Sequence, residues 1–207
     1  MTGDFKCRLY SWEEMYRLAE KTIAKINKSG YKPDKIIGIT RGGWVPSMMF
    51  SDLLGNRDML SLKIEHWSHT ATKDAKAVLK YPLQADLLGQ KILLVDDLTD
   101  SGDSIILALE DVKKNNPKEV RTATLIHKKQ SKIKPDYFAE EKNKWEWIIL
   151  PWNLNEDLLN LSKKILKEEG KLTNQQIRKK LKTKYNLNIN QKTLDTVLAR
   201  KNKIWKN

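Results

Sequence analysis

Short apolar runs alternate with helical patterns along most of the chain, and this alternation constrains the fold more than any other feature. The apolar runs, expected to be buried strands, are residues 35–40, 59–64, 91–95, 120–126 and 147–150. The helical patterns are residues 11–30, 44–54 and 104–115. Strands that alternate with helices are typical of βαβ units. We therefore predict an α/β fold with a mainly parallel sheet flanked by helices, and expect ligands at the carboxyl ends of the strands.

The charge of the chain is concentrated near its end. The 207 residues carry a net charge of +13, and residues 156–207 hold 14 basic and 5 acidic residues, a net of +9. We therefore predict two domains, residues 1–155 and a basic accessory domain of residues 156–207. In the second, helical patterns begin near Lys171 and Gln191 on either side of a turn at residues 185–190. This is typical of a small helical domain, with a winged-helix-like unit as the alternative.

Several classes of protein are excluded by composition. No apolar run reaches 18 residues, so no membrane span is expected. The first ten residues mix both charges and lack the apolar stretch of a signal peptide. A single cysteine, Cys7, cannot form an internal disulfide. These features predict a cytoplasmic protein.

Polar residues suited to binding a phosphorylated sugar follow the third predicted strand. The strand KILLV is followed by Asp-Asp-Leu-Thr-Asp-Ser-Gly-Asp-Ser at residues 96–104, and then by a helical pattern. A Ser-Gly-Asp-Ser turn at a helix N-terminus can present backbone N–H groups to a phosphate. The carboxylates would repel that phosphate, so they point instead to sugar hydroxyls or to a divalent cation. Taken one at a time, these residues also fit an ordinary turn that caps a helix.

Taken whole, residues 91–104 closely resemble the fingerprint of the type I phosphoribosyltransferases, enzymes that use phosphoribosyl pyrophosphate (PRPP). The resemblance implies that Asp96 and Asp97 hold the ribose hydroxyls, directly or through Mg²⁺. It implies that Asp100 faces N7 of a purine and acts in proton transfer. The implied 5′-phosphate loop comprises Asp100, Ser101, Gly102, Asp103 and Ser104. Asp103 departs from the small residue often found there.

A second strand end supports the same family. The strand KIIGIT is followed by Arg41-Gly42-Gly43, which combines a fixed cation with unencumbered backbone ahead of a predicted helix. Thr40 to Gly43 resembles the pyrophosphate loop of bacterial xanthine-guanine phosphoribosyltransferases. The resemblance implies that Arg41 and Gly42 bind pyrophosphate in a loop with a non-proline cis peptide. By itself the segment also fits a helix-entry turn with a surface arginine.

The base pocket is assigned on a third resemblance. Lys128, together with Trp147-Ile148-Ile149-Leu150-Pro151-Trp152, is similar to the purine pocket of the 6-oxopurine phosphoribosyltransferases. This implies that Trp147 stacks on the base, that Ile148 offers its backbone, and that Lys128 contacts O6. The alternative is a core or interface role for the tryptophans and a solvated lysine. His127 and Lys129 flank Lys128 where the family has a different pattern, which leaves adenine open as a substrate.

The resemblance implies a homodimeric purine-salvage enzyme that uses Mg²⁺ and transfers the phosphoribosyl group of PRPP to a purine base, with 6-oxopurines favoured. Residues 65–82 correspond to a mobile loop that closes over the reaction centre. The competing hypothesis is a PRPP-sensing regulator that binds nucleic acid through residues 156–207. Asp100 and Arg41 favour the enzyme, because a sensor needs no residue for proton transfer.

Overall fold

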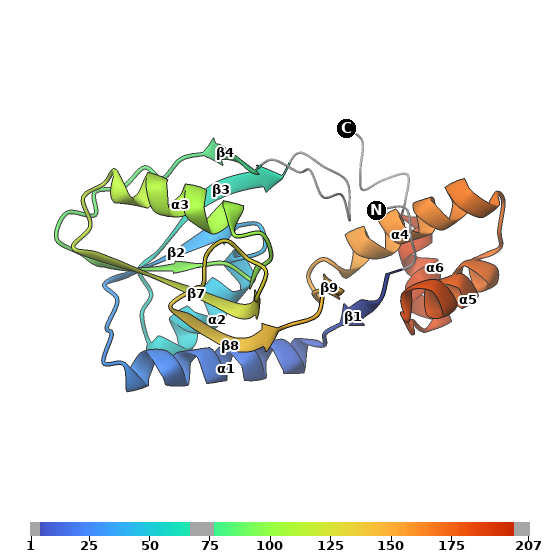
Figure 1. Cartoon of the computed structure of the whole chain (residues 1–207), viewed down its shortest axis with the longest axis horizontal. Helices are drawn as coiled ribbons and strands as arrows, with labels where there is room; N and C mark the ends of the chain where they lie inside the picture. Colours follow the sequence, from blue (N-terminus) through green and yellow to red (C-terminus); the bar gives the residue numbers. More distant parts are fainter. Residues whose placement is uncertain (1–4, 67–76, 201–207) are drawn as a thin grey trace. The chain divides into compact units, whose positions relative to one another are not determined.

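The computed structural model describes residues 5–66 and 77–200 and divides them into two compact units. The sheet unit comprises residues 12–66 and 77–145, and the helical unit comprises residues 5–11 and 146–200 (Figure 1). Within these ranges, no helix has the length and apolar character needed to span a bilayer. Each unit is made of segments that are far apart in sequence. The predicted domain division between residues 155 and 156 stays a prediction.

The sheet unit is built on seven strands. They are β2 (Lys35–Thr40), β3 (Met59–His66), β4 (Ala77–Tyr81), β5 (Lys91–Val95), β6 (Leu98–Thr99), β7 (Glu119–Lys128) and β8 (Tyr137–Lys142). The strand order is β4-β3-β2-β5-β7-β6, and β8 also pairs with β7. All pairs are parallel except β3 with β4. The predicted α/β fold with a mainly parallel sheet is therefore confirmed.

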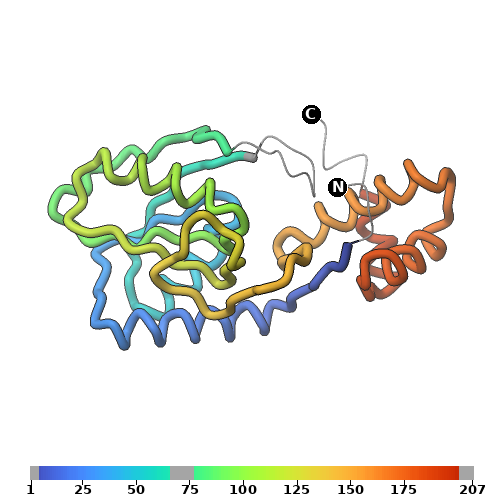
Figure 2. The backbone as a smooth tube through the Cα atoms, in the orientation of Figure 1, coloured from blue at the N-terminus to red at the C-terminus, as the bar shows by residue number. Residues whose placement is uncertain are grey.

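Helices cover both faces of this sheet. They are α1 (Trp12–Lys28), α2 (Trp44–Leu54) and α3 (Asp103–Lys113). α1 and α2 pack on one face and α3 on the other (Figure 1). The chain path in Figure 2 shows β2, β5 and β7 side by side although helical segments separate them in sequence. Their carboxyl ends consequently meet at one edge, where the predicted site residues that follow β2 and β5, and Lys128 at the end of β7, lie.

Successive residues of β2 face opposite sides of the sheet, which explains its uninterrupted apolar sequence. Ile37 and Ile39 belong to the core cluster that also contains Ile105 of α3. On the other face, Gly38 lies against α2, since a methyl group there would be 2.7 Å from Ser47 Oγ. The close packing of α2 on β2 fixes where the loop between them lies.

The helical unit contains two short strands and three helices. They are β1 (Cys7–Leu9), β9 (Trp147–Ile149), α4 (Leu154–Glu169), α5 (Asn174–Tyr185) and α6 (Gln191–Ala199). β1 and β9 are parallel. Thr173 and Gln176 form a capping box at the start of α5, and Asn190 caps α6. The rings of Phe5 and Tyr185 pack 4.9 Å apart between centroids.

The structure bears on four expectations. The run at residues 147–150 forms β9 in a separate two-stranded sheet, because β1 pairs with it and the main sheet does not. α4 is an additional helix, although apolar residues at helical spacing between residues 158 and 165 signal it. The predicted closing loop, residues 65–82, lies partly outside the described residues, and its described ends belong to the antiparallel strands β3 and β4. The described residues end at Arg200, directly after α6, so the winged-helix-like alternative stays a prediction.

Candidate active site

Two adjacent carboxylates stand at the carboxyl end of β5. Asp97 N donates to Asp96 Oδ1 at 2.9 Å, and Leu98 N donates to Asp97 Oδ1 at 2.7 Å. Asp97 is only 9% exposed. The backbone bonds aim the two side chains rigidly, so this acidic pair is a preorganised set of oxygen acceptors at the sheet edge.

Burial and mutual repulsion disfavour the ionised form of the acidic pair. Burial, followed by the charge of Asp97, raises the pKa of Asp96 well above its usual range, and a backbone hydrogen bond from Asp97 opposes this rise. A cation or the hydroxyl groups of a sugar would stabilise the ionised form. Carboxylate oxygens are the ligands that Mg²⁺ prefers, so the pair fits that ion. Among the described residues, no group of three or more His, Cys, Asp or Glu side chains is arranged to hold a metal.

The Arg41 loop, residues 40–43, contacts the acidic pair from the end of the neighbouring strand β2. The Thr40–Arg41 peptide bond is cis, as the family resemblance implies. A methyl group at Gly42 would lie 2.1 Å from Asp97 Oδ2, and one at Gly43 would meet backbone atoms of β2 and β5. Gly43 precedes α2, whose N-terminus has no side-chain cap among the described residues. The loop thus combines an arginine with two glycines whose backbone carries no side chain beside the acidic pair.

The phosphate loop, residues 100–104, ends in a second helix N-terminus. Gly102 has a φ of 90°, a left-handed conformation that glycine adopts without strain, and it precedes α3. No described side chain caps this helix, while Asp103 N donates to Ser101 Oγ at 3.3 Å. The helix dipole and the N–H groups of the first turn of α3 favour an anion here. Both loops thus lead into a helix N-terminus at the sheet edge, and their roles in anion binding stay predictions.

A cover segment, residues 129–134, packs over the phosphate loop and was not predicted. A methyl group at Gly102 would lie 2.6 Å from Ser131 Oγ, and Lys132 N donates to Ser101 O at 3.0 Å. Lys132 Nζ lies 2.7 Å from Asp103 Oδ1. This lysine offsets the carboxylate that departs from the family pattern. The run Lys-Gln-Ser-Lys-Ile-Lys after β7 is the signal that could have indicated it.

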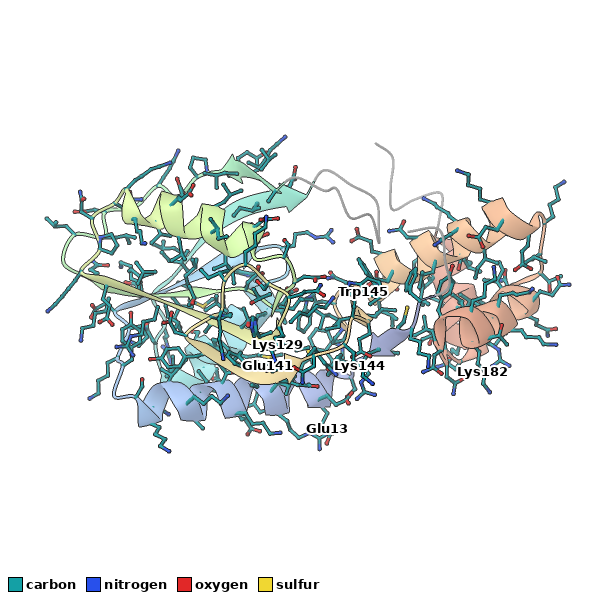
Figure 3. All side chains as sticks on the ribbon, viewed as in Figure 1. Glu13, Lys129, Glu141, Lys144, Trp145 and Lys182 are labelled. Carbon is teal, nitrogen blue, oxygen red and sulfur yellow. The ribbon has the colours of Figure 1, made fainter. Side chains whose placement is uncertain are left out.

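Asp100 and Lys128 meet at the ends of β6 and β7. Lys128 Nζ donates to Asp100 Oδ2 at 2.8 Å, and Gln130 Nε2 donates to Asp100 Oδ1 at 2.8 Å. Lys128 is 3% exposed, and its ammonium lies 5.5 Å from the centre of the Trp145 ring. Trp145 is labelled in Figure 3, in the segment after β8. The structure thus brings together the predicted acid and the predicted lysine, and adds an aromatic side chain beside them.

Trp147 and Ile148 belong to β9 of the helical unit. Ile148 is buried and lies opposite Arg8 of β1 in the strand register. The Trp147 indole Nε1 donates to Asp157 Oδ1 at 2.9 Å, which fixes the orientation of the ring. Asp157 lies in the first turn of α4 and was not predicted. The proposed roles of Trp147 and Ile148 in base binding stay predictions.

Asp157 is a buried carboxyl whose ionisation should couple to stability. Burial raises its pKa to about 7, and the Trp147 hydrogen bond opposes this rise. An unfolded aspartate titrates near pKa ~3.9. Because the folded protein retains the proton between these values, this group should lower the free energy of unfolding by up to about 1.4 kcal/mol per pH unit as pH rises from about 4 to about 7.

Asp157→Asn should therefore stabilise the protein at pH 8 relative to the unmodified chain, and much less at pH 5, since the amide can still accept the indole N–H. Urea unfolding of both proteins at the two pH values measures the difference. An equal difference at both pH values would show that Asp157 does not titrate in this range.

Comparisons with known proteins cover the sheet unit and the start of the helical unit. A family model, the phosphoribosyl transferase domain, matches residues 8–157. The chain is 33% identical over 153 residues to xanthine-guanine phosphoribosyltransferase from Cereibacter sphaeroides, covering 70% of this chain and 85% of the relative. The corresponding protein of Ruegeria is 32% identical over 155 residues, with 70% and 84% covered.

Solved structures give the same picture. A purine phosphoribosyltransferase from Pyrococcus horikoshii superposes with a TM-score of 0.62 at 29% identity, covering 71% of this chain and 94% of that one. The Helicobacter pylori xanthine-guanine-hypoxanthine phosphoribosyltransferase has a TM-score of 0.60 at 24% identity, with 77% and 99% covered, and shows the shared fold.

Proposed function

The chain belongs to the phosphoribosyl transferase domain family, and from this premise we propose that it transfers the phosphoribosyl group of PRPP to a purine base. The products are a nucleoside monophosphate and pyrophosphate, as in purine salvage. The observation that carries the proposal is the contact between the acidic pair and the Arg41 loop, beside a phosphate loop that leads into the N-terminus of α3. Three groups of acceptors and donors at one sheet edge match the ribose, the pyrophosphate and the 5′-phosphate of one substrate.

Each group of site residues binds a different part of PRPP. Ser101, Gly102 and the start of α3 bind the 5′-phosphate through backbone N–H groups and hydroxyls. Asp96 and Asp97 accept hydrogen bonds from the ribose hydroxyls and would hold Mg²⁺. When bound, that ion neutralises negative charge on the pyrophosphate oxygens. Arg41 and the Gly42 backbone stabilise the charge that develops on the leaving group.

The reaction is displacement at the anomeric carbon. The bond from C1′ to the pyrophosphate oxygen breaks, and a bond from C1′ to N9 of the base forms. The base loses its N7 proton, and Asp100 accepts it. The cover segment and the Arg41 loop orient the two ends of PRPP, so positioning and electrostatics supply the catalysis. No covalent enzyme intermediate is needed.

The Asp100–Lys128 pair is complementary to one edge of a 6-oxopurine. Such a base presents an acceptor at O6 and a donor at N7–H, which suit the Lys128 ammonium and the Asp100 carboxylate. Adenine presents an amino donor at position 6, which would leave the buried lysine without a partner there. We further propose that Trp147 stacks on the base and that Ile148 offers its backbone carbonyl.

This complementarity predicts the order of substrates. An unmet donor in a closed site costs about 1–3 kcal/mol, so kcat/KM should be about 10–200-fold higher for hypoxanthine or guanine than for adenine. Initial rates with each base at saturating PRPP measure the ratio. Equal or better use of adenine would contradict the role given to Lys128, even if the transferase activity itself is present.

We also propose a homodimer in a reducing, cytoplasmic compartment. Trp12 and Tyr16 of α1 and Trp44 and Met48 of α2 are exposed apolar side chains on two helices that pack together. Exposed apolar clusters of this kind mark interfaces. Cys7 is buried, and burial raises its pKa to about 12, so its thiol stays protonated.

Light scattering should therefore give twice the 24.1 kDa chain mass. A monomeric mass at micromolar protein concentration would contradict the proposed homodimer.

A further inference from the structure

The helical unit carries a basic hollow on the surface of α5 and α6. It has a volume of about 550 Å³ and lies outside the residues matched by the family model. Its lining consists of amide, lysine and arginine side chains: Gln175, Arg178, Lys179, Lys182, Asn188 and Gln191. Among the residues that the structure describes, no carboxylate and no aliphatic side chain lines it. A hollow of this composition is unlike most small-molecule pockets, which are lined mainly by apolar residues.

The basic side chains of α5 fall into two groups, one that forms ion pairs with acids of α4 and one that does not. Lys180 Nζ lies 2.6 Å from Glu169, and Lys184 Nζ lies 2.8 Å from Glu168. These acids stand at the end of α4 and neutralise that side of α5. Arg178, Lys179 and Lys182, by contrast, make no ion pair within the described part of the chain. The three exposed cations that line the hollow are therefore the ones left without an acidic partner, and Figure 3 shows Lys182 on α5.

Buried side chains and helix caps hold α5 and α6 in place beneath these cations. Ile177, Leu181 and Tyr185 bury the opposite side of α5. Asn186 ends α5 in a left-handed conformation, and Asn190 caps α6 by accepting from Thr193 N at 2.8 Å. Gln191, the first residue of α6, lines the hollow, so the positive end of the α6 dipole adds to the field there. Two helices joined by a short turn, with the N-terminus of the second at a basic surface, have the same order of elements as a helix-turn-helix motif.

Chemistry distinguishes between the polyanions that could bind. A membrane-binding helix needs apolar side chains to insert beside its cations. The exposed large apolar side chains of the described residues all lie in the sheet unit: Trp12, Tyr16, Trp44, Met48, Val78, Tyr81 and Leu88. The hollow instead offers amide groups, which can bond to sugars and base edges, between cations that bond to phosphates.

We propose that the basic hollow of α5 and α6 binds the phosphate backbone of a nucleic-acid duplex. The interaction is electrostatic in the first instance, with Arg178, Lys179 and Lys182 each contacting a phosphate. It adds a nucleic-acid contact to an enzyme whose active-site residues lie elsewhere, and it neither requires nor alters the transferase chemistry.

The test is fluorescence anisotropy of the full-length protein with labelled DNA and RNA duplexes across a range of salt concentrations. The variant replaces all three hollow cations by glutamine, which keeps helix propensity: Arg178→Gln, Lys179→Gln and Lys182→Gln. The matched control removes the same charge from exposed lysines of the sheet unit: Lys21→Gln, Lys28→Gln and Lys32→Gln. Nucleotide formation and circular dichroism check that both variants fold.

The unmodified protein and the control should bind a duplex with a steep salt dependence. The hollow variant should lose about three units of the slope of log K against log salt, and at least about tenfold in affinity at low salt. A preference between DNA and RNA would identify the form of duplex. An equal loss in the control, an absence of duplex binding, or tighter binding to anionic vesicles than to duplexes would each overturn the proposal.

Discussion

Asp100→Asn is expected to lower kcat for nucleotide formation about 10²–10⁴-fold, the range usual for removal of a general base. Asparagine keeps the size of the side chain and one acceptor oxygen, so it can still accept from Lys128. It cannot take the N7 proton at neutral pH. The dissociation constant of PRPP, measured by calorimetry, should change by less than about threefold, because the backbone of the phosphate loop is unchanged.

The matched control is Asp103→Asn, which makes the same change three residues later in the phosphate loop. Asp103 pairs with Lys132, away from the proposed proton transfer. Its replacement should therefore alter PRPP affinity more than kcat. If Asp100→Asn retained kcat within about threefold of the unmodified enzyme, or if the two variants behaved alike, Asp100 would not be the general base.

Gly42→Ala should lower kcat/KM for PRPP about 10²-fold or more, the second largest effect expected after that of Asp100→Asn. The added methyl group would lie 2.1 Å from Asp97 Oδ2, so the carboxylate must move. Displacement of a substrate-positioning group by about 1 Å costs about this much. The conflict involves a side chain and not the backbone, so the protein should still fold. Steady-state kinetics at varied PRPP measures the loss.

Gly89→Ala is the control for the effect of a glycine substitution as such. Gly89 has a φ of 74° and no neighbouring atom near an added methyl group. Its variant should lose about 1 kcal/mol of stability from the left-handed backbone while retaining kcat/KM. If Gly42→Ala retained full activity, the Asp97 carboxylate would have no part in PRPP binding.

The parts of the fold that could be predicted are those whose signal is local. Residues 35–40 and 91–95 are continuous apolar runs because both faces of these strands are buried, and the structure has strands with these bounds. β8 was missed because half of the residues of Tyr137–Lys142 are polar and most of the strand is only half-buried, so it has no continuous apolar run. β1 has three residues and is defined by pairing with β9, a long-range contact that a local pattern does not carry.

The candidate site divides in the same way. The acidic pair, the Arg41 loop and the phosphate loop follow strand ends in sequence, so strand positions were enough to bring them together. Sequence analysis missed three residues of the site: Lys132, Trp145 and Asp157. The role of each depends on contact with a residue of another element, which a local sequence pattern does not reveal. Asp157 could have been recognised only as an acid in the first turn of a helix. Its bond to Trp147 needs the fold.

The most direct test of the proposed function is whether the purified chain makes a nucleotide. It should be incubated with PRPP, Mg²⁺ and, separately, hypoxanthine, guanine, xanthine and adenine, with nucleotide and pyrophosphate both quantified. We expect at least one 6-oxopurine to give its nucleoside monophosphate, with one pyrophosphate released per nucleotide. PRPP binding without nucleotide from any of the four bases would contradict the assignment as a purine phosphoribosyltransferase.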